Sequence, residues 1–156
     1  MNRLTILVLT AVVAVGATAA IAAGASSPTT AAKVGVRNTK LGKILVNGKG
    51  VTLYLFMKDK NGKSACSGAC AKAWPPLLTK GRAQAAGGAS AAKLGTTRRS
   101  DGTTQVTYIG HPLYTFVMDN NKPSSTTGQG SKAFGAEWYV LGANGNKIEK
   151  ASSGGY

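Results

Sequence analysis

The sequence predicts a mainly β protein built from two related β-hairpin units with pseudo-two-fold symmetry, joined through short helical turns. The first observation is a phrase stated twice: residues 50–59 read GVTLYLFMKD and residues 110–119 read GHPLYTFVMD. Five residue types recur in these phrases at one fixed offset, which favours two copies of one structural unit that pack against each other.

The second observation is the distribution of tight-turn sequences. Asn-Gly and Asp-Gly pairs occur at residues 47–48, 61–62, 101–102 and 144–145, and such pairs favour the positive φ angles of hairpin turns. The runs between them, rich in β-branched and aromatic residues, predict three hairpins: 43–47 with 51–57, 103–109 with 113–118, and 137–141 with 146–149. Short helical turns are expected within 67–74 and 90–94.

The third observation is the alternation of side chains within the repeated phrase. Tyr54 and Phe56 fall on one face of a strand, and Tyr114 and Phe116 do the same in the second copy. The alternate positions are largely apolar too, so both strands are expected to be central and covered on both faces. Core packing also explains the two methionines near the ends of these strands better than metal binding does: Met57 and Met118.

The N-terminus carries the pattern of an export signal. Arg3 precedes an apolar run over residues 4–23, and small residues over 23–25 offer a cleavage site before Ser26. The alternative is an uncleaved membrane anchor, because the run is almost long enough to span a bilayer. Lipid attachment is excluded because no cysteine lies at the cleavage site, and no later run could span a membrane.

The remaining chain divides by composition. The predicted organisation is a signal peptide over 1–25, a flexible leader over 26–40, repeat unit 1 over 41–78, a connecting segment over 79–100, repeat unit 2 over 101–150, and a tail over 151–156.

The charge is strongly positive. The chain has 19 basic and 5 acidic residues, a net charge of +14, and cleavage of the signal peptide removes one arginine to leave +13. Such a field favours anionic partners such as cell-wall polymers or lipid head groups; the alternative is a solubilising surface of scattered lysines. The basic residues are spread along the chain, which argues against a dedicated nucleic-acid site.

Two cysteines are the most reactive groups of the sequence. In an exported protein, Cys66 and Cys70 are expected to form a disulfide. The alternative is a redox pair or a copper site that uses both cysteines with His111, the single histidine. No cofactor is otherwise predicted.

Catalytic groups are scarce, and no enzyme activity is expected. Asp59 and Asp119 follow the repeated strands beside turns, where a carboxylate usually accepts backbone N–H groups. His111 is expected at an exposed turn. The chain has no G-x-S-x-G sequence, and its glycine-rich stretch at 128–130 lacks the lysine of a phosphate-binding loop.

The aromatic residues are placed alike in the two copies. Tyr54, Phe56 and Trp74 correspond to Tyr114, Phe116 and Trp138. They are expected to form an aromatic core across the pseudo-two-fold interface; the alternative is a pair of surface platforms for a ligand. The candidate binding residues are therefore Trp74, Trp138 and His111.

At these residues the chain resembles a family of small bacterial exported proteins, described as secreted repeats or predicted lipoproteins with a Y-x-(F/W/Y)-x-x-D motif. The motif occurs twice, as Tyr54-x-Phe56-x-x-Asp59 and as Tyr114-x-Phe116-x-x-Asp119. The resemblance extends over about residues 41–149 and includes these flanking motifs: Ser64-x-Cys66-x-Gly68-x-Cys70, Trp74-Pro75-Pro76-Leu77, Arg99-x-Asp101-Gly102, Gln105-Val106-Thr107-Tyr108, Gly128-Gln129-Gly130 and Trp138-Tyr139-Val140. It implies an envelope location and no established active site.

The sequence therefore predicts a secreted or extracytoplasmic bacterial protein, non-enzymatic, that serves as a structural or binding module for anionic cell-wall or membrane surfaces. The alternative function is a redox or copper-handling accessory protein that uses Cys66 and Cys70.

Overall fold

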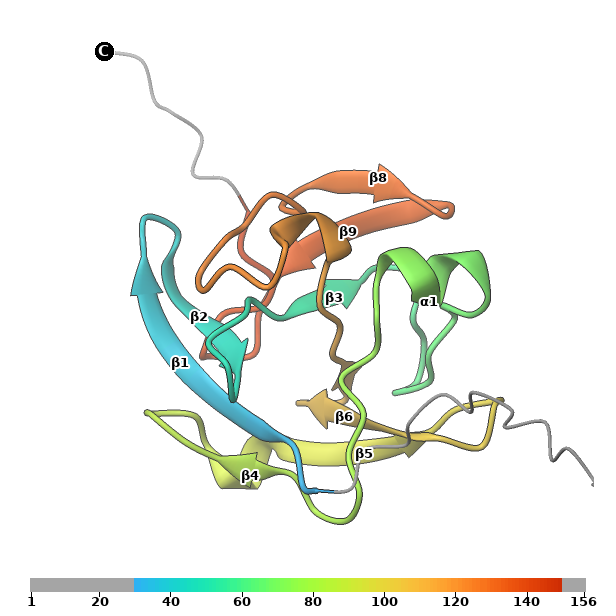
Figure 1. Cartoon of the computed structure of the whole chain (residues 1–156), viewed down its shortest axis with the longest axis horizontal. Helices are drawn as coiled ribbons and strands as arrows, with labels where there is room; N and C mark the ends of the chain where they lie inside the picture. The colour runs from blue at the N-terminus through green and yellow to red at the C-terminus, as the bar shows by residue number, and fades with distance from the viewer. Residues whose placement is uncertain (1–29, 150–156) are drawn as a thin grey trace, which may run out of the picture.

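The computed structural model of the chain describes residues 30–149. The predicted signal peptide, the first residues of the leader and the tail lie outside this range. The described elements, in chain order, are β1 (Lys33–Thr39), β2 (Gly42–Asn47), β3 (Tyr54–Phe56), α1 (Ala69–Ala73), β4 (Gln84–Ala85), η1 (Ala91–Lys93), β5 (Leu94–Arg98), β6 (Thr104–Tyr108), β7 (His111–Pro112), η2 (Val117–Asp119), β8 (Ser131–Ala133) and β9 (Ala136–Val140). The mainly β architecture with short helical turns is confirmed (Figure 1).

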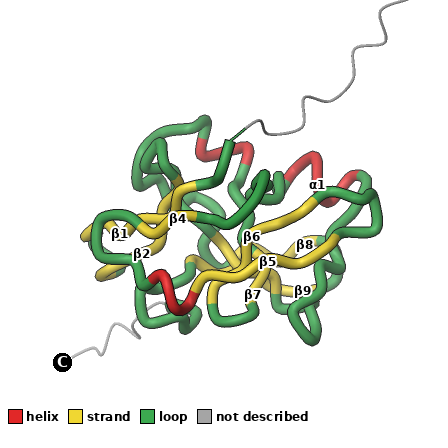
Figure 2. Tube along the Cα trace, turned by 90° about the horizontal axis from the view of Figure 1, so that it is seen from below, coloured by secondary structure: helices red, strands yellow, loops and turns green. Residues whose placement is uncertain are grey.

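The strands form three small sheets, with strand orders β2-β1-β4, β3-β9-β8 and β5-β6-β7. The sheet of β1, β2 and β4 forms one side of the molecule, and α1 lies on the opposite side (Figures 1 and 2). Single bridges link the sheets to one another. The core therefore lies between short, mutually supporting sheets.

The pseudo-two-fold relation is centred on two equivalent tyrosines. The backbone N–H of Tyr54 donates to the carbonyl of Tyr114 (2.8 Å), and the N–H of Tyr114 donates to the carbonyl of Tyr54 (3.0 Å). The backbone hydrogen bonds of the preceding leucines are also similar in the two copies. The N–H of Leu53 donates to the carbonyl of Leu45, and the N–H of Leu113 donates to the carbonyl of Val106 (both 3.0 Å). The two copies thus pair through the same residue of the repeated phrase.

The first and third predicted hairpins are present, and the second is present with a different second strand, because β7 covers only His111–Pro112 and the predicted strand over 113–118 runs into η2. The strands β6 and β7 pair Tyr108 with His111 around a turn at 109–110, and a bridge between Val46 and Thr52 closes the matching hairpin of the first copy. A bridge between Leu141 and Lys147 closes the third. The structure adds a further hairpin, β8–β9, which the sequence did not predict.

The prediction of a flexible leader over 26–40 is wrong for Lys33–Thr39, which form β1. This strand pairs antiparallel with β2 along its whole length and parallel with β4. Its Val34 is completely buried, and Val36 packs partly against the same core. Pairing with β2, the next strand in the chain, and burial of Val34 stabilise β1, whereas the polar local composition gives little sign of a strand.

The connecting segment over 79–100 is likewise structured. It contains β4 and the whole of β5, and β5 pairs antiparallel with β6 from Leu94↔Tyr108 to Arg98↔Thr104. The segment lies close to β1 at Gly35, where an added Cβ would lie 3.4 Å from the carbonyl oxygen of Ala86. Each unit therefore begins with a strand that composition alone assigned to a linker.

The central strands are covered on both faces, as predicted. Tyr54 and Phe56 lie in one buried cluster, and Leu53 and Leu55 lie in the other. The prediction that both methionines pack in the core is wrong, because 37% of Met57 and 63% of Met118 are exposed. Met57 directly follows the buried Phe56 at the end of β3, and Met118 lies in η2 after the exposed Val117.

Candidate functional site

The motif residues meet in two crossed pairs. The hydroxyl of Tyr54 donates to Asp119 Oδ2 (2.7 Å), and the hydroxyl of Tyr114 donates to Asp59 Oδ2 (2.8 Å). Each tyrosine therefore binds the aspartate of the other copy. Sequence reasoning placed all four residues in the right motif but did not predict that their contacts cross between the repeats.

The second oxygen of each carboxylate binds its own loop, which agrees with the predicted turn role. Asp59 Oδ1 accepts the backbone N–H of Ala65 (2.8 Å). Asp119 Oδ1 accepts both the N–H (3.0 Å) and the hydroxyl (2.6 Å) of Thr127. Each aspartate thus fastens a loop of one repeat to the strand of the other.

Burial governs the protonation of these groups. Desolvation raises the pKa of Tyr54 and of Tyr114 far above the ordinary range, and the neighbouring carboxylates act in the same direction. Desolvation also raises the pKa of Asp59, although the Ala65 N–H, the Tyr114 hydroxyl and the charge of Arg99 oppose it. The tyrosines accordingly remain neutral donors at physiological pH.

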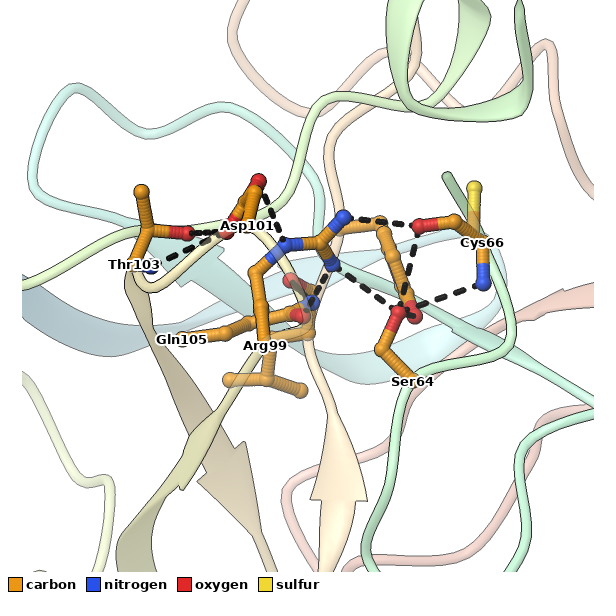
Figure 3. Close-up of polar contacts among 8 residues, drawn as sticks. Ser64, Cys66, Arg99, Asp101, Thr103 and Gln105 are labelled. Atoms are coloured by element: carbon orange, nitrogen blue, oxygen red, sulfur yellow. Dashed lines mark hydrogen bonds and ion pairs between the residues drawn. The ribbon is translucent and has the colours of Figure 1, made fainter. Parts of the chain in front are cut away.

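A buried arginine extends the Asp59–Tyr114 pair into a network (Figure 3). Arg99 Nη1 donates to Ser64 Oγ (2.9 Å) and to Gln105 Oε1 (2.7 Å), and Nη2 donates to the carbonyl of Cys66 (2.7 Å). Its Nε lies 3.5 Å from Asp101 in an ion pair. Ser64 Oγ in turn lies 2.8 Å from the Tyr114 hydroxyl.

This network joins the two repeats at the disulfide loop, because Arg99 and Gln105 belong to the second copy and Ser64 and Cys66 to the first. Gln105 continues it by donating to the carbonyl of Leu113 (2.8 Å). One sign of the network is visible before folding, because Arg99-x-Asp101-Gly102 and Ser64-x-Cys66 both belong to the motifs that resemble the family. Nothing in the sequence indicated that they meet.

The aromatic residues form a column between the copies. The rings stack in the order Phe56, Trp138, Trp74 and Phe116, with successive centroids 4.0 Å apart. The tyrosines meet the column edge-on, Tyr54 against Trp74 (5.3 Å) and Tyr114 against Trp138 (5.1 Å). Stacked and edge-to-face contacts of this kind stabilise beyond simple burial.

The predicted aromatic core is therefore the arrangement found, and the alternative of surface platforms is wrong. Trp74 and Trp138 are fully enclosed. Gly128 covers the column so closely that a Cβ there would lie 2.6 Å from the ring of Trp74. This close approach accounts for the first glycine of the stretch over 128–130 and leaves the indoles no route to a ligand.

The cysteines form a disulfide, as predicted. Cys66 and Cys70 are both buried in the cluster that holds the aromatic column. His111 is exposed in β7 and lines a separate pocket beside Leu55. Within residues 30–149 no three histidine, cysteine or acidic side chains gather as metal ligands, so the alternative copper site of Cys66, Cys70 and His111 is not assembled.

A family model described as a secreted repeat of unknown function, Lipoprotein_15, matches residues 35–78 and 95–142. These two ranges cover more than half of the chain, and the chain belongs to this family of secreted repeats. Both ranges begin inside the strands β1 and β5, earlier than the predicted units at 41 and 101. No curated protein and no solved structure matches the chain.

Family membership places the protein outside the cytoplasm, as predicted. In the described part of the chain, no helix has the length and apolar character needed to cross a membrane.

Proposed function

We propose that this protein is a non-enzymatic binding module of the bacterial cell envelope that adsorbs to anionic surfaces. The supporting observation is that the exposed charged side chains are mainly basic. Among residues 30–149, every lysine and arginine is exposed except Lys93 and Arg99. Basic groups therefore dominate the charge that the described surface presents to solvent.

The five acidic residues of the chain are too few to offset this field, and each of them is bound by a neighbour. Asp59 and Asp119 bind tyrosine hydroxyls inside the protein. Asp101, Glu137 and Glu149 pair with Arg99, Lys132 and Lys147. The other exposed basic residues of the described chain are left to attract polyanions, and such long-range attraction raises the local concentration of an anionic partner.

The same contacts support a non-enzymatic role. The buried aspartates and tyrosines of the motif hold the repeats together, and the raised pKa of both tyrosines moves them away from acid–base work near neutral pH. The motif is thus explained by folding alone.

Co-sedimentation of the exported protein with phospholipid vesicles tests the proposal. We expect binding to vesicles with an anionic lipid at low salt, loss of binding as salt rises above about 0.3 M, and no binding to zwitterionic vesicles. Wall polymers rich in phosphate should compete with the vesicles. Equal binding to both vesicle types, or none to anionic vesicles at low salt, would reject the proposal.

A charge variant provides the matched control. Replacement of four exposed, unpaired lysines by glutamine should weaken binding, whereas replacement by arginine should leave it unchanged, because only the first set alters the net charge. The four positions are Lys40, Lys43, Lys60 and Lys63.

A further inference from the structure

The backbone register brings a thioether and an imidazole together outside the motif. The antiparallel bridge pairs Tyr54 with Tyr114, and the strands β3 and β7 lie side by side beyond it. Met57 and His111 each lie three residues from the bridged tyrosines, on the side where β3 approaches β7. The two chains stay close further along, because a Cβ on Gly62 would lie 3.5 Å from the carbonyl oxygen of Gly110.

Both side chains face the same open space. Met57 lies on the face of the strand that carries Leu55, and Leu55, Met57 and His111 line one pocket of about 520 Å³ together with Asn146, Lys147 and Glu149. Both Met57 and His111 are exposed. Met57 therefore lines a pocket and is not packed in the core.

The pseudo-two-fold mate of this pair carries no donor atoms. The equivalent of Met57 is Val117 and the equivalent of His111 is Val51, by the sixty-residue offset of the repeated phrase. The repeat architecture therefore requires neither a methionine nor a histidine at these positions. The two donor side chains belong to one copy of the pair only.

We propose that Met57 Sδ and the imidazole of His111 bind one Cu(I) ion in this pocket. Soft thioether and imidazole donors suit Cu(I). Both side chains line the same pocket, so a single ion in it can contact the two donors.

The surroundings suit a monovalent cation. The ammonium of Lys147 lies 2.6 Å from Glu149 and 4.8 Å from the centre of the Tyr139 ring. The positive charge nearest the pocket is thus neutralised by a carboxylate that also lines it. The site is independent of the anionic-surface proposal, since it requires no polyanion, and it does not use the disulfide.

Competition with a colorimetric Cu(I) chelator tests the site in the exported protein with its disulfide intact. We expect one Cu(I) per chain, at least tenfold weaker retention in Met57→Leu and in His111→Val, and no change in Met118→Leu, which alters an exposed methionine outside the pocket. The substituted side chains are exposed, and circular dichroism verifies that each variant is folded.

Silver(I) provides a second readout, because it is an air-stable analogue and the chain has a single histidine. Its addition should shift the imidazole NMR signals of the wild type, and Met57→Leu should abolish most of that shift. The proposal is overturned by a wild type that retains no Cu(I), by equal retention in Met57→Leu, or by a silver shift that ignores residue 57.

Discussion

The hydroxyl of Tyr54 donates a 2.7 Å hydrogen bond to the carboxylate of Asp119, which lies 65 positions later in the other copy of the repeat. Tyr114 and Asp59 make the reciprocal bond. The tyrosine and the aspartate of one motif are close in the sequence, but each forms its tyrosine–aspartate hydrogen bond with the other copy of the repeat. The tyrosine and the aspartate of one motif therefore belong to two different hydrogen-bonded pairs, each completed by the other copy.

The crossing predicts which pairs of substitutions are energetically coupled. Tyr54→Phe should lower the free energy of unfolding by about 1.5–3 kcal/mol, because it removes a hydrogen bond to a buried carboxylate. Combination with Asp119→Asn should be non-additive by at least about 0.5 kcal/mol. Urea denaturation of the single and double variants measures both quantities.

The within-motif pair is the control for that cycle. Tyr54 and Asp59 share no hydrogen-bond partner, so Tyr54→Phe and Asp59→Asn should add to within about 0.5 kcal/mol. Stronger coupling within a motif than across motifs would contradict the crossed arrangement.

The tyrosines also predict the alkaline limit of stability. The pKa of Tyr54 and of Tyr114 is raised in the folded protein, so an unfolded chain releases these protons first, near pH 10. The stabilisation is complete below that pH and is lost as pH rises above it. Each tyrosine contributes a slope of up to about 1.4 kcal/mol per pH unit.

Urea denaturation between pH 9 and 11.5 checks this expectation. The slope should be smaller in Tyr54→Phe and smallest in the double variant with Tyr114→Phe. Absorbance near 295 nm should show these tyrosines ionising only as the protein unfolds; early ionisation of all tyrosines would refute the effect of burial.

Arg99 should tolerate no conservative replacement. Arg99→Lys keeps the charge but cannot reach Ser64, Gln105 and the Cys66 carbonyl together, and the loss of such a buried network is expected to cost about 3 kcal/mol or more. Its neighbour Arg98 is exposed, so Arg98→Lys should change stability by less than about 0.5 kcal/mol. Equal effects of the two substitutions, measured by thermal or urea unfolding, would disprove the network.

The turn of the β8–β9 hairpin is strained by its sequence. Phe134 (φ 58°) and Gly135 (φ 92°) both have positive φ angles, the pattern of a two-residue turn that favours Asn-Gly. Phe134 is 41% exposed, so packing offsets little of the strain. Phe134→Asn should therefore stabilise the protein by about 1 kcal/mol.

Phe134→Ala separates relief of strain from loss of the ring. Alanine meets the same steric penalty in this conformation, so it should give no gain in melting temperature. A gain with alanine equal to that with asparagine would contradict the explanation from the turn.

Much of the fold follows from local patterns in the sequence. The turn pairs at 47–48 and 144–145 predicted the first and third hairpins, and the alternation of Tyr54 and Phe56 predicted both core faces, because these signals act within a few residues. The pair at 101–102 forms the turn of the β5–β6 hairpin, which was not predicted. The strand β1 was not predicted, because its stability comes from pairing with β2 and β4. A polar run such as KVGVRNT gives little local indication that these pairings form.

The residues of the candidate site were predicted from the sequence, but the hydrogen bonds between them were not. In the sequence, each of the two tyrosines is compatible with the aspartate of either copy, so the spacing of Tyr54, Asp59, Tyr114 and Asp119 cannot separate the two pairings. Met57 was assigned to the core because it follows apolar neighbours, yet the strand leaves the core at Phe56 and exposes the next residue. Both outcomes depend on where distant segments dock.

The crossed tyrosine–aspartate bonds also bear on the origin of this chain. A single repeat, made alone, would keep the loop donors of its aspartate but would lack the carboxylate that the other copy supplies to its tyrosine. Such a fragment would be expected to assemble as a symmetric dimer, and joining the two genes end to end would preserve every one of these contacts. Once fused, either half could change independently, which is how one copy can carry a disulfide, or a methionine and a histidine, where the other has none.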